Sequence, residues 1–194
     1  MFVNDSHIVQ GYGEDFEWMW AQARPYGQQN APAAAPSAPP ADRFPSVKFN
    51  GASLPNFVFS PRGGTTTEMV KAIDAAKKEV DVAMFSFASR PLFDALKRAA
   101  ARGVQVKLLL YIKSAFPFKD EAKAAGIAVH YKGGRTENGI MHNKYAVLDG
   151  ALLINGSFNW SATAEDLNTE NTIFTMVPNY VQPYKAEFEK LFAK

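Results

Sequence analysis

The chain of 194 residues contains no cysteine and only three histidines, His7, His130 and His142. The absence of cysteine excludes disulfide bonds, thiolate nucleophiles and cysteine-based metal sites. The sequence has no apolar run of transmembrane length, and its N-terminus lacks the charged and apolar segments that mark a signal peptide. These absences leave the compartment of the protein open.

Charge is modest and unevenly distributed. The chain holds 21 Lys and Arg and 19 Asp and Glu residues, which gives a formal net charge of +2. Residues 1–56 contain three basic and five acidic residues, so residues 57–194 carry a net charge of +4. A basic domain suits a polyanionic substrate or an anionic membrane surface, but an ordinary solvated surface explains this charge equally well. The 47% of apolar residues suffice for one domain with a sizeable core.

A proline- and alanine-rich stretch divides the chain. Residues 31–41 have the sequence APAAAPSAPPA, a composition that cannot bury a core and favours an extended linker. We therefore assign residues 23–52 to a linker and residues 53–194 to the main domain.

Residues 1–22 repeat the C-terminal end of the chain at a constant shift, without a gap. The identical pairs are Phe2–Phe174, Val9–Val181, Gln10–Gln182, Tyr12–Tyr184, Phe16–Phe188, Glu17–Glu189 and Ala21–Ala193. Two amphipathic helices can resemble each other by period alone, but period does not explain a shared Val-Gln-x-Tyr. Residues 1–22 are therefore predicted to be the last strand and helix of a preceding copy of the domain in a tandem protein; otherwise they form an interaction helix.

Strands and helices alternate through the main domain. Strands are predicted at 56–60, 80–87, 104–112, 127–131, 145–148, 151–155 and 172–177, and helices at 65–78, 90–102, 119–125 and 180–193. Thr65 to Glu68 offers a cap for the first of these helices. Asp149-Gly150 between two apolar runs indicates a hairpin, which adds antiparallel pairing. The pattern predicts an α/β layered fold with a mixed β-sheet flanked by helices.

The segment 141–160, MHNKYAVLDGALLINGSFNW, gathers several reactive groups. His142 and Lys144 lie two residues apart on a predicted strand and therefore point to the same face. Where the second strand ends, Ser157 and Asn159 can reach the same surface, and a helix that follows would add its N-terminus. An imidazole, an ammonium, a hydroxyl, an amide and a helix N-terminus together suit a phosphate group.

This segment resembles the HKD motif of the phospholipase D superfamily. The motif H-x-K, four residues, D, six residues, G-S-x-N is filled by His142, Lys144, Asp149, Gly156, Ser157 and Asn159. Residues 168–171, Asn-Thr-Glu-Asn, resemble the N-x-E-N segment of short single-motif members, which include bacterial periplasmic endonucleases and the mitochondrial cardiolipin hydrolase and RNA nuclease group. The resemblance covers roughly residues 57–194 and is specific for the superfamily, not for the substrate. The periplasmic relatives favour an exported bacterial protein whose signal is missing from this chain.

The resemblance implies hydrolysis of a phosphodiester through a covalent phosphohistidine on His142. Lys144 would stabilise charge on the phosphoryl oxygens, with hydrogen bonds from Ser157 and Asn159. Glu170 resembles the carboxylate that holds the histidine through its other ring nitrogen. The leaving group needs a proton, which in the superfamily comes from the histidine of a second HKD copy. That copy must come from a homodimer partner or from an upstream tandem domain.

Other residues of the segment have simpler roles. Asp149 is predicted to be a turn residue, because Asp-Gly alone accounts for it, and Gly156 to permit close backbone approach. His130 is predicted to be structural, and His7 has no partner in view. Trp160 could stack on a base, line a lipid slot or pack in the core.

Lys132 and Arg135 lie in the glycine-rich loop 132–139 before the motif. They form either a basic lip that grips an anionic substrate or ordinary solvated loop charges. Phosphohistidine chemistry needs no metal, and no carboxylate pair lies near His142 in sequence, so we expect no metal and no other cofactor. The preferred function is hydrolysis of a phosphodiester in a phospholipid or a nucleic acid. The alternative is a catalytically inert half-domain that binds an anion or a partner, because the chain holds a single HKD copy.

Overall fold

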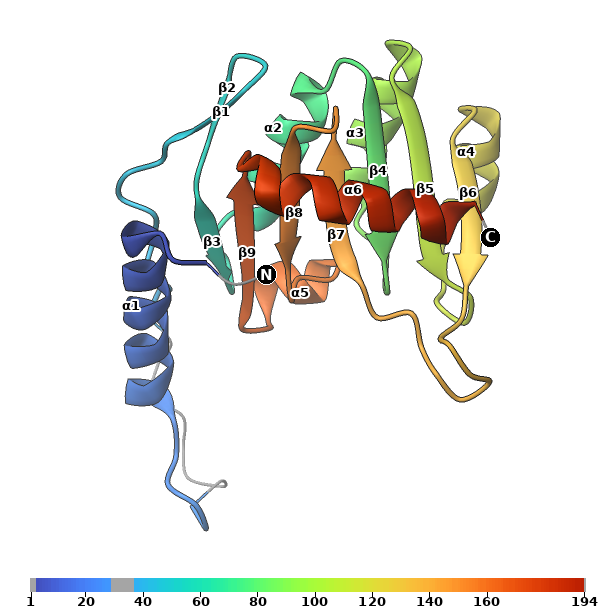
Figure 1. Ribbon diagram of the computed structural model, residues 1–194. Coiled ribbons are helices and arrows are strands. Elements are labelled where there is room, and N and C mark those ends of the chain that lie inside the picture. Colours follow the sequence, from blue (N-terminus) through green and yellow to red (C-terminus); the bar gives the residue numbers. More distant parts are fainter. Residues whose placement is uncertain (1–2, 29–36, 194) are drawn as a thin grey trace.

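The computed structural model describes residues 3–28 and 37–193, which are built around a seven-stranded mixed sheet (Figure 1). In spatial order the strands are β3 (Phe57–Ser60), β9 (Glu170–Thr175), β8 (Leu152–Gly156), β7 (Lys144–Leu148), β4 (Glu79–Met84), β5 (Gln105–Tyr111) and β6 (Ala128–Lys132). β4, β5 and β6 pair in parallel, and all other neighbours in the sheet pair antiparallel.

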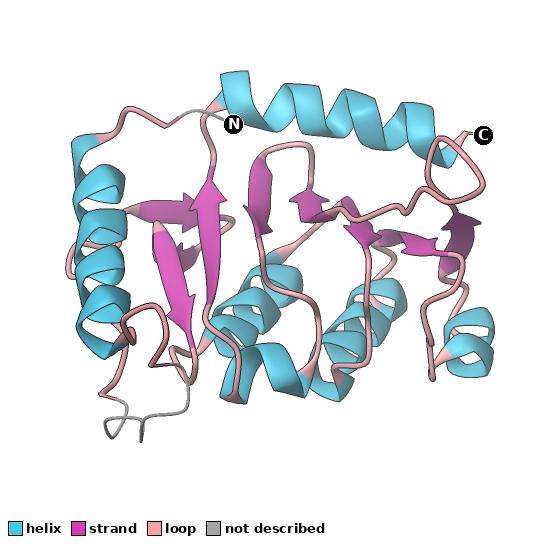
Figure 2. Cartoon of the chain, turned by 90° about the horizontal axis from the view of Figure 1, so that it is seen from below, coloured by secondary structure: helices cyan, strands magenta, loops and turns pink. Residues whose placement is uncertain are grey.

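Helices cover both faces of the sheet. α6 (Pro178–Phe192) crosses one face, and the opposite face is covered by α2 (Thr65–Ala75), α3 (Arg90–Ala101), α4 (Lys119–Ala124) and α5 (Ala162–Asp166), as Figure 2 shows from below. The predicted α/β layered fold with a mixed sheet is therefore confirmed. No helix in the described ranges is both long enough and apolar enough to cross a bilayer.

β5 shows how local sequence sets the two layers. Leu108 and Leu110 point into the core under α3, whereas Leu109 between them points into the core under α6. Side chains of a strand alternate between faces, so a strand covered on both sides needs a nearly continuous apolar run. α3 supplies its share of the larger core from Leu92 and Leu96, which lie four residues apart on one helical face and are fully buried.

The predicted hairpin joins β7 and β8 and turns at Asp149 and Gly150. Both residues have positive φ angles, 53° and 62°, as a turn of this hand requires. The Asp149 carboxylate also accepts hydrogen bonds from the backbone N–H groups of Lys77, Lys78 and Glu79, at 2.7 to 3.2 Å. These N–H groups follow α2, which explains why that helix ends at Ala75 and not at residue 78 as predicted.

The predicted cap of α2 is also wrong. Its N-cap is Gly64, with a φ of 87°, and no side chain of the first turn caps it. The Glu165 carboxylate of α5 accepts the N–H groups of Gly64 and Thr66 instead, at 3.0 and 2.7 Å. An acid from a distant segment thus satisfies N–H groups that local sequence assigned to the Thr65 segment.

Two larger boundary differences remain. The strand predicted at 80–87 ends at Met84, and beyond it Phe87 pairs with Trp160 in the segment that follows β8. The linker predicted at 23–52 ends inside a hairpin of β1 (Val47–Phe49) and β2 (Ala52–Leu54). Its turn, Asn50-Gly51, is a hairpin signal that was missed. The proline- and alanine-rich stretch 31–41 lies largely outside the described residues.

α1 (Ser6–Gln22) stands at the β3 end of the sheet, outside both helical layers (Figures 1 and 2). Ile8 and Tyr12 pack against Phe57 and Phe59 of β3. A helix is therefore present in the N-terminal repeat, whereas residues 3–5 form no strand. The assignment of residues 1–22 to a preceding copy stays a prediction.

Candidate active site

The motif residues lie at one edge of the sheet. β4, β5, β6 and β8 end at this edge, and β7 and β9 begin there, at the bottom of Figure 1. We call it the strand-end edge and define it by residues 61–64, 85–89, 111–118, 132–144 and 156–170. Asp149 lies at the opposite edge, so its prediction as a turn residue remote from the chemistry agrees with its position.

His142 and Lys144 form the centre of the strand-end edge. Lys144 pairs with Met84, and the N–H of Phe85 donates to the carbonyl oxygen of Asn143 at 2.8 Å, so the β4–β7 ladder continues past the end of the strand. The Lys144 Nζ lies 3.2 Å from Nε2 and 3.3 Å from Nδ1 of His142, whose ring is exposed. The two side chains thus point to the same side, as the strand alternation predicts.

Phe85 supports both groups and was missed in the sequence, where it looked like an ordinary apolar strand residue. Its ring meets the His142 imidazole edge to face, with centroids 4.4 Å apart, and lies 5.1 Å from the Lys144 ammonium. Tyr111 of β5 stacks on the other side of Phe85 at 5.2 Å. The aromatic stack restrains the imidazole and offers the ammonium a cation–π contact.

The electrostatics favour a neutral imidazole beside a cation. Burial and the positive charge of Lys144 lower the pKa of His142 below its ordinary value. Burial also lowers the pKa of Lys144, and the nearby carboxylate of Glu170 opposes this effect. At pH 7 His142 is therefore mainly neutral, which is the nucleophilic form of imidazole. No carboxylate of the described residues forms an ion pair with Lys144, so its charge is available to an anion.

The segment after β8 is bound tightly to β9. The N–H of Ser157 donates to the Asn171 carbonyl oxygen, and the Asn171 N–H donates to Ser157 Oγ, both at 3.0 Å. A Cβ atom on Gly156 would lie 1.9 Å from that carbonyl oxygen, so the close approach predicted for Gly156 is confirmed. Ser157 Oγ already accepts hydrogen bonds, which leaves its hydroxyl proton for a substrate.

Asn159 is half-buried, and Trp160 is buried. The Asn159 Oδ1 atom is buried without a hydrogen-bond partner in the described chain, a costly state for an amide. Trp160 is 1% exposed and packs edge to face on Phe87, with centroids 4.9 Å apart. It therefore belongs to the core and cannot stack on a base. Ser161 caps α5 by accepting the N–H of Ala164 at 3.2 Å.

Glu170 lies at the start of β9 on the same side of the sheet as Lys144. It accepts a hydrogen bond from the Asn168 side chain at 2.9 Å, and its charge acts on Lys144. The predicted hydrogen bond from His142 to Glu170 is not formed among the described residues; both ring nitrogens lie next to the Lys144 ammonium.

The other histidines and the two loop cations considered in the sequence have different surroundings. His130 Nδ1 lies 2.9 Å from the Phe192 carbonyl oxygen and its ring stacks on Phe192, which agrees with a structural role. His7, far from the edge, lies 2.7 Å from the Asp42 carboxylate. Lys132 ends β6, and Arg135 lies in the loop that leads from β6 to His142; neither forms an ion pair with another described residue.

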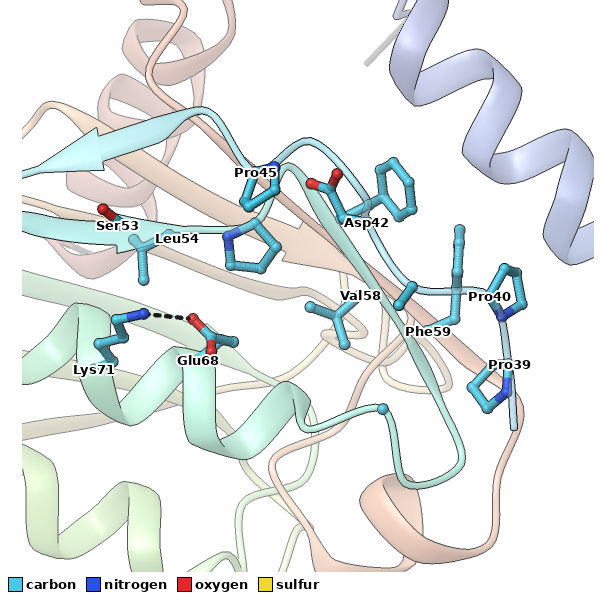
Figure 3. Close-up of a pocket in the computed structure, with 14 residues that line it drawn as sticks. Pro39, Pro40, Asp42, Pro45, Ser53, Leu54, Val58, Phe59, Glu68 and Lys71 are labelled. Atoms are coloured by element: carbon cyan, nitrogen blue, oxygen red, sulfur yellow. Dashed lines mark hydrogen bonds and ion pairs between the residues drawn. The ribbon is translucent and has the colours of Figure 1, made fainter. Parts of the chain in front are cut away.

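The described residues of the strand-end edge hold no metal cluster. Within residues 3–28 and 37–193, no three His, Asp or Glu residues are grouped as metal ligands would be. A cavity of about 350 Å³ lies elsewhere, between residues 39–45, β3 and α2 (Figure 3). Leu54, Val58 and several prolines line it, with the Glu68–Lys71 ion pair at its rim. No motif residue lines this cavity.

Comparison with known proteins gives consistent matches. The sequence profile described as "Cardiolipin synthase, PLD-like domain" matches residues 69–192. The chain is 30% identical over 165 residues to the mitochondrial cardiolipin hydrolase of Canis lupus familiaris, which covers 84% of this chain and 59% of that protein. It is 33% identical over 138 residues to a phospholipase D of Rickettsia bellii, which covers 70% of this chain and 67% of that protein. The match spans about three fifths of the length of the mitochondrial cardiolipin hydrolases of Canis lupus familiaris and Danio rerio.

Solved structures share the fold. Nuc, a phospholipase D family member from Salmonella typhimurium, superposes with a TM-score of 0.63 at 24% identity and covers 71% of this chain and 92% of its own. NucT from Helicobacter pylori superposes with a TM-score of 0.62 at 24% identity and covers 70% of this chain and 95% of its own. These likenesses establish the architecture around the strand-end edge.

Proposed function

The chain belongs to the phospholipase D superfamily of phosphodiesterases, and from this premise we propose that it hydrolyses a phosphodiester through a covalent phosphohistidine on His142. One observation carries the proposal: a neutral imidazole lies beside an ammonium that forms no ion pair with a carboxylate of the described residues. The imidazole can attack phosphorus, while the Lys144 ammonium attracts the phosphoryl oxygens. Asn159 and the Ser157 hydroxyl add hydrogen-bonding groups on the same segment.

The reaction has two steps. A ring nitrogen of His142 forms a bond to phosphorus as the bond to the leaving oxygen breaks, and a second imidazolium gives its proton to that oxygen. Water then attacks the phosphohistidine, the phosphorus–nitrogen bond breaks, and the second imidazole takes the proton from water. The negative charge of Glu170 favours the charged form of Lys144, which attracts the phosphoryl group. Both steps need a second imidazole to transfer a proton, and a single copy of the motif does not supply it.

The second HKD motif comes from a homodimer partner or from an upstream tandem domain. The strand-end edge is exposed at His142, so another motif can face it across the bound phosphodiester. Subunit mixing tests the homodimer. If two copies share each site, adding an excess of His142→Asn protein to the wild type should reduce activity towards zero after subunit exchange. Unchanged activity under conditions where exchange is demonstrated would eliminate the shared site between identical chains.

A phospholipid is the first candidate substrate. Ile112 and Ile140 are 59% and 49% exposed at the strand-end edge, and Tyr131 of the neighbouring β6 is 39% exposed. The same segments carry Lys132 and Arg135, which form no ion pair with another described residue. Apolar and basic side chains together suit an anionic lipid surface. Relatives named cardiolipin hydrolase and phospholipase D support the same choice. A nucleic acid is the second candidate, because residues 57–194 carry a net charge of +4.

Parallel turnover assays decide between these candidates. The wild type and the His142→Asn variant would be given vesicles with a labelled phosphatidyl lipid, and a labelled oligonucleotide, both in EDTA. We expect turnover of one substrate by the wild type only, with activity retained in the chelator. Loss of activity in EDTA that a divalent ion restores would contradict the mechanism. Binding without turnover of either substrate, in a protein shown to be dimeric, would favour the inert half-domain.

A further inference from the structure

α1 and α6 share one apolar pattern but differ in what covers it. At the constant shift that aligns the two ends of the chain, each α6 residue that packs on the sheet has an apolar counterpart in α1. These pairs are Tyr180–Ile8, Val181–Val9, Tyr184–Tyr12, Phe188–Phe16, Leu191–Met19 and Phe192–Trp20. In α6 these residues bury against Tyr145, Val147 and Leu153 of the sheet. The pattern is therefore that of a helix which closes one face of this kind of sheet.

In α1 most of the same positions face solvent. Val9, Phe16 and Trp20 are 55%, 54% and 67% exposed, whereas Val181 and Phe188 of α6 are 1% and 0% exposed. Exposed aromatic side chains at this spacing form one continuous stripe along a helix. We call Val9, Phe16, Met19 and Trp20 the α1 stripe. It is an apolar surface without a partner among residues 3–28 and 37–193.

The aromatic pair inside the stripe has the geometry of its counterpart in α6. Phe16 and Trp20 stack with centroids 5.8 Å apart and an interplanar angle of 23°. Phe188 and Phe192 of α6 stack at 5.4 Å and 20°, and Phe188 is fully buried by the sheet. The side chains of α1 thus already hold the arrangement that α6 uses for packing.

The exposure of the stripe does not come from a loose helix. Gly11 of α1 lies so close to Phe57 of β3 that a Cβ atom would be 2.2 Å from the ring, and Tyr12 donates a hydrogen bond to Asn171 Oδ1 at 3.1 Å. Asp15, on the same side, is 5% exposed. α1 is therefore seated on this domain through Ile8, Gly11 and Tyr12, while the stripe beside this contact stays exposed.

Charge and topology indicate which kind of surface covers the α1 stripe. α1 holds Glu14, Asp15 and Glu17 and no Lys or Arg, so it complements a basic domain such as residues 57–194 with their net charge of +4. A second copy of this chain offers no open sheet face, because its own α6 covers the position. We propose that the α1 stripe closes the sheet of a second phospholipase D-like domain that precedes α1 in the same polypeptide.

α1 would then be a shared element of two domains. The stripe would pack on the sheet of the preceding domain, whereas Ile8, Gly11 and Tyr12 pack on β3 of the present one. This arrangement would fix the two domains beside each other through a helix and not only through the proline-rich linker. The packing of α1 is independent of the chemistry at His142, so the inference goes beyond the proposed function.

A helix transplant in the full chain tests the packing. α6 residues 178–192 would be replaced by residues 6–20 of α1, with Gly13→Lys in the graft to restore the contact that Lys185 makes with Asp81. We expect a cooperative unfolding transition with a Tm within about 10 °C of the wild type, since the buried pattern is kept. The control graft takes residues 8–22, which turns the stripe by about 200° away from the sheet. It should show no cooperative transition.

The protein from its natural source provides the second measurement. Captured with an antibody against residues 53–194, it should have an intact mass above 21.3 kDa by the mass of a further domain. A mass of 21.3 kDa overturns the proposal, and so does an in-register graft that melts no better than the control. Failure of the wild type to turn over any phosphodiester would change neither measurement, so the two proposals can fail separately.

Discussion

Lys144 of β7 and Lys185 of α6 are both partly buried, but their surroundings are opposite. Lys185 of α6 donates to the carboxylates of Glu79 and Asp81 at 2.7 and 2.6 Å. Burial alone would lower the pKa of Lys185, but these hydrogen bonds outweigh it and raise the pKa. Lys144 contacts an imidazole and the Phe85 ring, and its pKa is lowered by burial. One ammonium is neutralised by the fold, and the other is left for a ligand.

The difference separates stability from function. A buried ion pair that lost one member would leave an uncompensated charge in the core, so Lys185 is tied to folding. A partly buried cation without a counter-ion costs stability and is retained for what it binds. The variants below test this division, from the largest expected effect to the smallest.

The strongest test removes the nucleophile at the strand-end edge. His142→Asn should reduce turnover by about 10⁴-fold or more, because no phosphohistidine can form. The Tm should stay within about 2 °C of the wild type, because the imidazole is exposed. The matched control is His130→Asn, which changes a histidine of structural role and should keep its activity. Similar losses in both variants would show that the effect is not specific to the edge.

Exchange of the two lysines for methionine tests the comparison directly. Lys144→Met should reduce turnover by about 10²- to 10³-fold with little loss of stability. Lys185→Met should reduce the free energy of unfolding by about 3–5 kcal/mol, because Asp81 is fully buried and would keep only Lys107 at 3.7 Å. Its turnover per folded molecule should be that of the wild type. Denaturant titration and turnover would be measured on the same preparations. A large loss of stability in Lys144→Met, or a large loss of turnover per folded molecule in Lys185→Met, would contradict the comparison.

Asp149 is a motif residue that we expect, like Lys185, to contribute to stability and not to turnover. Burial would raise its pKa, but hydrogen bonds from Glu79, Lys77, Lys78 and Asn50 outweigh it and lower the pKa. A lowered folded-state pKa adds stability above the unfolded pKa of about 4 and loses it as the pH falls through the folded value. Asp149→Asn should therefore cost about 1–3 kcal/mol at pH 7 and much less at pH 2. Turnover should be retained.

The control for this variant is Asp166→Asn, which makes the same charge change at an exposed residue. It should alter unfolding little at either pH. A large loss of turnover in Asp149→Asn without loss of stability would instead place Asp149 in the chemistry.

The smallest expected effect is on the titration of His142. Its pKa is lowered by burial and then by the charge of Lys144. Lys144→Met should therefore raise the pKa of His142, as measured by NMR titration of the ring. Lys123→Met, an exposed lysine on α4, should leave it unchanged. An unchanged pKa in Lys144→Met would show that the ammonium does not act on the imidazole.

The comparison of the lysines could not have been made from sequence. Lys144 was found through the H-x-K spacing, whereas Lys185 is one of several lysines on a helical pattern. Asp81 and Lys185 are brought together only when α6 crosses the sheet. The same holds for Phe85, which is adjacent to no motif residue in the chain but contacts both His142 and Lys144.

The sequence by itself determined the alternation of strands and helices, the Asp149-Gly150 hairpin, the common side of His142 and Lys144, and membership of the superfamily. These features follow from local periodicity and fixed spacing, which do not depend on distant contacts. Only the tertiary structure decided that Trp160 is core, that Glu165 caps α2, and that Glu170 acts on Lys144 without a bond to His142. It also separated α1 from α6, because the same apolar pattern is buried or exposed according to whether a sheet face lies opposite it.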